Sequence, residues 1–188
     1  MVRTLFGRLA ILLLLTGAAA LAPFHLEPAK AGQDLGNLPK AAVAEPAPEI
    51  SFATVDGRQF KLSDFRGKPV LLWLIATWCP TCEASAQVLA ENIEQLARDG
   101  LVIVTLKLYE NLGYPGPDIA TFGKKWAGDA YTAPNWLWGD AGKRTSFIYD
   151  PPGFPDIYWL VDAEGILRAV DTAPNVTIDK IRAFAAGS

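Results

Sequence analysis

Residues that bind metals or form disulfides are scarce in this sequence. Its 188 residues include two cysteines, one histidine and one methionine. Two cysteines exclude a disulfide-dense scaffold, and with one histidine they cannot form a closed four-ligand zinc site without carboxylates. An excess of positive charge is also lacking, because the formal net charge is −3, which argues against nucleic acid as a partner. Any cysteine chemistry must therefore be carried out by a single pair.

No apolar run in the sequence reaches the length of a comfortable membrane span. Arg3 and Arg8 precede an apolar stretch, residues 9–22, that is shorter than the roughly 20 residues a span needs. Two interpretations of residues 1–22 stay open, a cleaved signal peptide and an anchor that enters the inner membrane through residues 9–22. Both place the rest of the chain outside the cytoplasm, in a bacterial periplasm.

The remaining chain divides into a spacer and one domain. Residues 23–46 are rich in Pro and Ala and show no sustained period, so we expect a flexible linker. Residues 47–188 are about 140 residues, the common size of a domain. Hydrophobic residues make up 51% of the sequence and charged residues 20%, which suits a packed globule.

The first half of this domain predicts a hairpin followed by a βαβ unit. Residues 50–62 hold two extended runs around Asp56-Gly57, a strong hairpin signal. Residues 69–76 are almost all apolar and predict a central strand, residues 80–99 an amphipathic helix, and residues 101–106 a second buried strand. The two strands should be parallel, because a helix connects them.

The second half predicts fewer elements. Residues 118–126 suggest a helix, residues 127–153 resist assignment, and residues 157–161 and 166–170 form an antiparallel pair. Thr177 is the expected N-cap of a last helix, residues 178–186. The predicted fold class is α/β, with a central mixed sheet, helices on both faces and an N-terminal hairpin.

The chemistry is expected at Trp78-Cys79-Pro80-Thr81-Cys82, between the first buried strand and the long helix. Pro80 suits the first helical position, which makes Cys79 the N-cap residue. The unpaired N–H groups and the dipole of the helix then favour a Cys79 thiolate. Cys82 lies on the same helix face, so the two sulfurs can close a disulfide. This arrangement predicts a nucleophilic thiol with a resolving partner.

Other uses of the cysteine pair fit the sequence less well. A structural disulfide across two residues would close a tiny loop and stabilise little. Covalent haem attachment needs a histidine after the second cysteine, where Glu83 stands. A peroxiredoxin-type peroxidase needs a threonine three residues before its reactive cysteine, where this chain has Ala76.

Residues 62–70 and 76–82 resemble the TlpA/ResA-like extracytoplasmic thiol–disulfide oxidoreductases of the thioredoxin superfamily. The resemblance implies a thioredoxin-like fold and dithiol–disulfide exchange. It makes Cys79 the attacking cysteine and Cys82 the resolving one, with no organic cofactor. Its partners would be a protein client and a membrane thiol–disulfide electron carrier.

The resemblance also implies a cis-proline that faces the cysteines, with substrate backbone bonds to the residue before it. Pro155, preceded by Phe154, fits this role, and Pro151 and Pro152 compete for it. Phe154 and Pro155 are therefore predicted to shape the site. Trp78, Pro80 and Thr81 are predicted to do the same.

Two departures from the family bear on function. Many thioredoxins carry a buried acid six residues before the first cysteine, where this chain has Trp73, so Glu83 or water must accept the Cys82 proton. Position 81 is threonine rather than the histidine of strongly oxidising relatives. We therefore expect a reductase or a maturation factor, for example for cytochrome c or another exported protein, rather than a general oxidant.

A binding role is the rival interpretation. The two thiols could hold copper(I) in a copper-delivery or assembly module, although copper-delivery relatives add a histidine that this domain lacks. Residues 107–152 carry aromatic side chains that could dock a partner or pack a second layer over the sheet, and we favour packing; they are Tyr109, Tyr114, Trp126, Tyr131, Trp136 and Trp138.

Overall fold

A computed structural model of the chain describes residues 37–187. The chain divides into two units, Met1–Gly32 and Gln33–Ser188, and the described residues belong to the second. The predicted leader, residues 1–22, and most of the predicted linker lie outside the described residues. Within residues 37–187, no helix combines the length and apolar character needed to cross a membrane.

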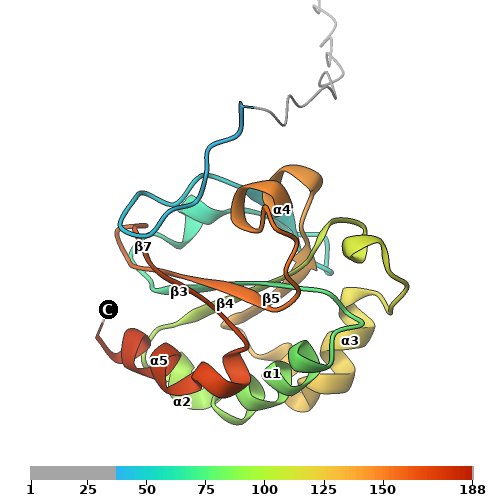
Figure 1. The fold of residues 1–188 in the computed structure, drawn as a ribbon. Helices are drawn as coiled ribbons and strands as arrows, with labels where there is room; N and C mark the ends of the chain where they lie inside the picture. The colour runs from blue at the N-terminus through green and yellow to red at the C-terminus, as the bar shows by residue number, and fades with distance from the viewer. Residues whose placement is uncertain (1–36, 188) are drawn as a thin grey trace, which may run out of the picture. The chain divides into compact units, whose positions relative to one another are not determined.

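A five-stranded mixed sheet forms the centre of the domain (Figure 1). Its spatial order is β5-β4-β3-β6-β7, with β3, β4 and β5 parallel and with β6 and β7 antiparallel to their neighbours. The strands are β3 (Val70–Ile75), β4 (Val102–Lys107), β5 (Trp136–Asp140), β6 (Ile157–Val161) and β7 (Leu167–Thr172). Every residue of β3 is buried, as its continuous apolar sequence predicts for a strand covered on both faces.

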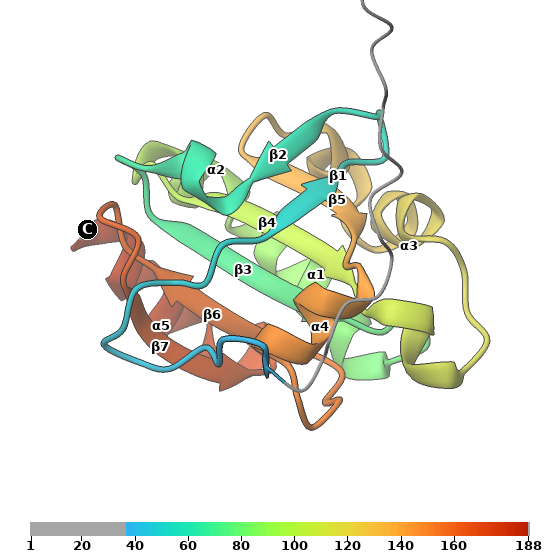
Figure 2. The same cartoon turned by 90° about the horizontal axis from the view of Figure 1, so that it is seen from above.

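Helices cover both faces of this sheet, which confirms the predicted fold class. Figure 1 shows α1 (Pro80–Glu91), α2 (Ile93–Arg98), α3 (Ile119–Trp126) and α5 (Pro174–Ala186) together on one face. The other face carries α4 (Lys143–Tyr149) and the hairpin of β1 (Ser51–Ala53) and β2 (Gln59–Lys61), which Figure 2 shows in front of the sheet. Three short 3-10 helices complete the fold: η2 (Leu62–Phe65), η3 (Tyr109–Gly113) and η4 (Gly128–Thr132).

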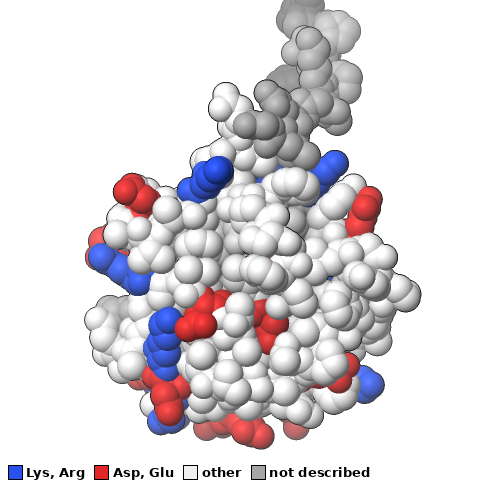
Figure 3. Space-filling view, viewed as in Figure 1, with Lys and Arg blue, Asp and Glu red and all other residues white. Residues whose placement is uncertain are grey.

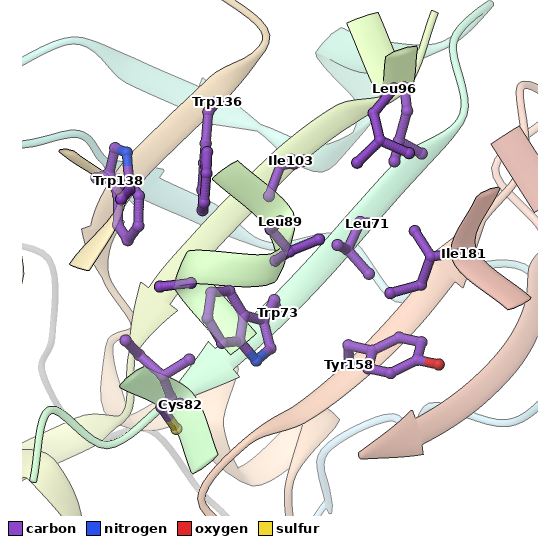
Figure 4. Packing of buried hydrophobic residues seen from close by; sticks show 14 of the residues in the cluster. Leu71, Trp73, Cys82, Leu89, Leu96, Ile103, Trp136, Trp138, Tyr158 and Ile181 are labelled. Carbon is purple, nitrogen blue, oxygen red and sulfur yellow. The ribbon is translucent and has the colours of Figure 1, made fainter. Parts of the chain in front are cut away.

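The alternating side chains of β3 divide the core into two layers. Leu71, Trp73 and Ile75 point toward α1 and α5, while Leu72 and Leu74 point toward the hairpin and α4. Figure 4 shows the first layer, in which Trp73 lies between Cys82 and the side chains of α1 and α5. The first turn of α1 is thus fixed to the middle of the sheet.

The structure differs from the sequence predictions at three places. The helix predicted over 80–99 is broken at Asn92, whose backbone leaves the helical conformation while its side-chain amide bonds to the Val88 carbonyl. The unassigned residues 127–153 contain β5 and α4. The last helix begins at Pro174, so Thr177 is not its N-cap but lies inside it, bonded to the Ala173 carbonyl.

The described end of the predicted linker runs along the domain. The Ala44 N–H donates to the Leu167 carbonyl, Leu167 N–H donates to the Glu45 carbonyl, and Pro46 forms a bridge with Ile166. Leu38 and Ala41 pack against the hairpin layer of the core. Residues 44–46 are therefore bonded to the start of β7, at the edge of the sheet.

Charged side chains of both signs are scattered over the face drawn in Figure 3. Large uncharged areas lie between them, and no extended patch of one sign covers the described part of that face.

Candidate active site

Cys79 is the N-cap residue of α1, at the end of the central strand. Its backbone is extended, with φ −88° and ψ 119°, and Pro80 follows at the first helical position. The Cys79 carbonyl accepts the N–H of Glu83, which starts the helical ladder. Strand β3 fixes the position of the sulfur, and the helix directs its unpaired N–H groups toward it.

The surroundings of Cys79 favour its thiolate. Hydrogen bonds from the Cys82 thiol and from the Thr81 hydroxyl lower the pKa of Cys79 from 9.0 to about 5, against the effect of burial. The Thr81 oxygen lies 3.0 Å from the sulfur. Both cysteines are free thiols in the structure. The reduced pair thus consists of a thiolate at Cys79 and a protonated donor at Cys82.

Cys82 is completely buried beside Trp73 (Figure 4). Burial, its hydrogen bond to the Cys79 sulfur and the negative charge of Asp156 all raise the pKa of the Cys82 thiol. A thiol in this state is a poor nucleophile until a base removes its proton. The exchange reaction therefore requires an acceptor close to this sulfur.

Asp156 is the buried acid whose charge acts on Cys82, and the sequence prediction missed it. Asp156 is 1% exposed. This burial raises the pKa of its carboxyl to about 6, although the hydrogen bonds that it accepts oppose the shift. The Trp73 indole N–H donates to Asp156 Oδ1 at 2.8 Å, and the Ser85 hydroxyl lies 3.3 Å from Oδ2. A non-glycine φ of +71° at Asp156 adds local strain, which is typical of functional positions.

The indole of Trp73 binds the Asp156 carboxylate, which comes from the loop before β6 and not from strand β3. The strand position that carries a buried acid in many thioredoxins holds an indole here, and that indole binds a carboxylate from the loop before β6. Glu83, the predicted acceptor, lies half-buried on the first turn of α1, and the structure gives it no hydrogen bond to either sulfur. The signal available in the sequence was an acid next to Pro155 together with a tryptophan in β3.

The prediction of a cis-proline is wrong for this structure. No peptide bond in residues 37–187 is cis, so Pro155 and its competitors Pro151 and Pro152 are all trans. The loop instead turns through left-handed backbone at Gly153, with φ +74°, and at Asp156. Phe154 is 56% exposed, and its N–H is bound by Asp150 Oδ1 at 2.9 Å. The predicted loop does face the cysteines, through Asp156.

The aromatic residues of 107–152 divide between buried and exposed positions. Trp136 and Trp138 are buried and stacked, with ring centroids 4.6 Å apart, as a packing layer requires. Tyr114 is 62% exposed and lies against Trp78, with ring centroids 5.0 Å apart.

Residues 37–187 contain no group of three His, Cys, Asp or Glu side chains that could hold a metal ion.

Known proteins resemble this chain in sequence and in fold. A model of the AhpC/TSA family matches residues 43–111. The thiol:disulfide interchange protein DsbE of Escherichia coli (strain K12) is 31% identical over 157 residues, which are 80% of this chain and 78% of the relative. The thiol-disulfide oxidoreductase ResA of Geobacillus thermodenitrificans (strain NG80-2) is 30% identical over 84 residues, 45% of this chain and 46% of the relative.

A solved structure of a DsbE-type thiol:disulfide interchange protein from Chlorobium tepidum has the same fold. Its TM-score is 0.60 at 21% identity, and the match covers 78% of this chain and 99% of that one. Fold and relatives define the class as thioredoxin-like thiol–disulfide oxidoreductases. Within this class, the chain belongs to the family of DsbE-type thiol:disulfide interchange proteins, which confirms the resemblance to extracytoplasmic-type thiol–disulfide oxidoreductases such as ResA.

Proposed function

We propose that the protein is an extracytoplasmic disulfide reductase that acts on a protein client through Cys79 and Cys82. The observation that carries this proposal is the paired state of the two thiols. Hydrogen bonds hold Cys79 as a thiolate at the helix start, while burial keeps Cys82 protonated behind it. One sulfur is thereby prepared to attack and the other to resolve.

The reaction transfers two electrons in two exchange steps. The Cys79 thiolate attacks one sulfur of the client disulfide, whose S–S bond breaks, and the other client sulfur leaves as a thiolate. Cys82 then gives its proton to Asp156 and attacks the Cys79 sulfur of the mixed disulfide. The first client cysteine leaves as a thiolate, and a Cys79–Cys82 disulfide forms. The client is reduced and the protein pair is oxidised.

Two features support a reductase rather than a strong oxidant. Position 81 is a threonine, so no imidazolium stabilises the thiolate from within the pair. Burial is the main cause of the raised pKa of Asp156, and the Cys79 charge adds to it, because the carboxylate and the thiolate repel each other. Because this repulsion exists only in the reduced pair, it favours loss of electrons from the dithiol.

The cellular setting is part of the proposal. Residues 1–22 would direct or anchor the domain outside the cytoplasm, where disulfides persist. A membrane thiol–disulfide carrier would return the pair to its dithiol form. The client would be an exported protein with a disulfide that must be opened, as in cytochrome c maturation. No organic cofactor enters these steps.

Trapping of the client tests the assignment of the cysteines. In Cys82→Ser the first exchange can occur but the mixed disulfide cannot be resolved, so a covalent adduct should accumulate on Cys79. The matched variant Cys79→Ser should form no such adduct, because the remaining thiol is buried and protonated. Equal trapping by both variants would show that the roles are assigned wrongly.

A further inference from the structure

The chain after β4 adopts a backbone conformation that non-glycine residues rarely take. Glu110, Asn111 and Leu112 have φ values of 50°, 54° and 59°, and Gly113 continues at 83°. Three consecutive non-glycine residues in the left-handed region carry a conformational cost each. Such a turn persists only where other contacts hold it, and here those contacts lead to the residues just before Cys79.

Asn111 makes these contacts with both its side chain and its main chain. The Thr77 N–H donates to Asn111 Oδ1 at 2.8 Å, and the Trp78 indole N–H donates to the Asn111 carbonyl at 2.8 Å. Asn111 Nδ2 donates to the Tyr114 carbonyl at 3.1 Å. Asn111 is itself buried, at 8% exposed. One residue thus fixes Thr77, Trp78 and Tyr114 relative to one another.

This arrangement places an exposed aromatic ring beside the residue that precedes Cys79. Tyr114 lies against Trp78, with ring centroids 5.0 Å apart. Phe154 is exposed on the loop that also carries Asp156, and Leu112 reaches that loop at Gly153. Tyr114 and Phe154 are 62% and 56% exposed, whereas Cys79 itself is only 4% exposed. The Tyr114 ring is therefore available to a client chain whose cysteine is bound to Cys79.

We propose that Asn111 is a positioning residue for client recognition and that Tyr114 contacts the client beside its cysteine. The segment that binds is an extended stretch of a client protein with an apolar side chain next to the cysteine. Aromatic rings gain from contact with an apolar side chain, while a neutral polar side chain such as asparagine would lose water there without a hydrogen-bond partner. This inference rests on the proposed reductase function and names the substrate class for the same site.

Two synthetic peptides test this inference. Each carries one cysteine in a mixed disulfide with a small thiol, and they differ only in Leu or the similarly shaped but polar Asn beside that cysteine. We expect the wild-type KM for the Leu peptide to be about tenfold lower than for the Asn peptide. In Tyr114→Ala the two KM values should agree within about twofold. Val55→Ala, a matched change at an exposed apolar residue of the β1–β2 turn, should keep the tenfold preference.

Variants of Asn111 separate its amide from its backbone conformation. Asn111→Gly tolerates the left-handed backbone but loses the amide, so it should fold and still lose the Leu preference. Asn111→Asp keeps an acceptor for the Thr77 N–H but loses the donor to the Tyr114 carbonyl, so it should also lose the Leu preference. Turnover of hydroxyethyl disulfide, which is too small to need Tyr114, should fall less in both variants than turnover of the Leu peptide.

Four results would overturn parts of this scheme in distinguishable ways. A wild-type enzyme without preference between the peptides, or a Tyr114→Ala variant that keeps the preference, contradicts the assignment of Tyr114. Loss of hydroxyethyl disulfide turnover in Asn111→Gly shows that Asn111 acts on the cysteines and not on the client. Failure of the wild-type protein to reduce either kind of disulfide contradicts the proposed function itself.

Discussion

At the scale of single residues, the site depends on two ionisations that oppose each other. The Cys79 thiolate is favoured by hydrogen bonds from Cys82 and Thr81, while Asp156 is held near the sulfurs at the expense of its own ionisation. Cys79 must be ionised before it attacks the client disulfide. Asp156 must be ionised before it can accept the Cys82 proton when the mixed disulfide is resolved. The two pKa values, about 5 and about 6, meet both requirements near neutral pH.

The Thr81 hydroxyl should contribute measurably to the thiolate. Thr81→Val removes a hydrogen bond to Cys79 and keeps the shape of the side chain, so the pKa of Cys79 should rise from about 5. Ultraviolet absorbance of the thiolate, followed against pH, measures this midpoint. Thr81→Ser retains the hydroxyl and serves as the control. A wild-type midpoint near the ordinary thiol value of about 8.5 would refute this description of the site.

Asp156 should control the pH dependence of resolution. A carboxyl accepts a proton only when it is ionised, so resolution of the mixed disulfide should accelerate as pH rises through about 6 and then level off. Asp156→Asn should abolish this rise and slow resolution about a hundredfold at neutral pH, measured by rapid mixing.

Glu83→Gln provides the matched comparison for this prediction, because Glu83 is the other acid close in sequence to the cysteines. It should leave the rate of resolution within about twofold of wild type. If Glu83→Gln were the slow variant and Asp156→Asn the normal one, the proton would go to the first turn of α1, as the sequence alone suggested.

At the scale of elements, the backbone of the hairpin of β1 and β2 approaches the sheet closely at β5. Thr54 forms a bridge with Gly139 of β5, and the Val55 N–H donates to the Trp138 carbonyl. A Cβ atom at Gly139 would overlap the backbone oxygen of Ala53, which cannot swing away as a side chain could.

Gly139→Ala should therefore weaken the attachment of the hairpin. We expect a loss of about 1–3 kcal/mol in the free energy of unfolding, measured by urea denaturation. Gly142→Ala, three residues further on, has open space around the new methyl group and should change stability by less than about 1 kcal/mol. Similar effects of both changes would contradict a specific contact at Gly139.

The elements that could be predicted from sequence are those with strong local signals. The apolar run of β3, the Asp56-Gly57 turn and Pro80 at the start of α1 each have a physical cause within a few residues. Elements β5 and α4 escaped prediction because Gly, Pro and tryptophan obscure their periods, and their burial depends on partners distant in the chain. Asp156 escaped for the same reason, since Trp73 lies 83 residues away.

At the scale of the whole molecule, the buried acid should cost stability at the pH where it serves the reaction. The pKa of Asp156 is raised from 3.8 to about 6 on folding, so the folded state binds its proton more tightly than the unfolded chain does. Its contribution is therefore favourable below pH 3.8 and is lost as pH rises through about 6.

Asp156→Asn should consequently stabilise the protein at pH 8, by up to about 3 kcal/mol for a shift of about two pKa units. The gain should fade as pH falls below about 4, where the acid becomes protonated in the unfolded state as well as in the folded one. Thermal unfolding at several pH values measures the gain in stability at pH 8 and its decrease toward low pH. A variant that is less stable than wild type at pH 8 would show that hydrogen bonds to the carboxylate outweigh its burial.

The reduction potential of the Cys79–Cys82 pair tests the proposed reductase most directly. A thiolate with a pKa of about 5 raises the potential above that of thioredoxin, and repulsion from Asp156 lowers it again. Equilibration with glutathione or dithiothreitol redox buffers should give a value between about −270 and about −200 mV. A value near −120 mV, that of a strong oxidant, would contradict a reductase.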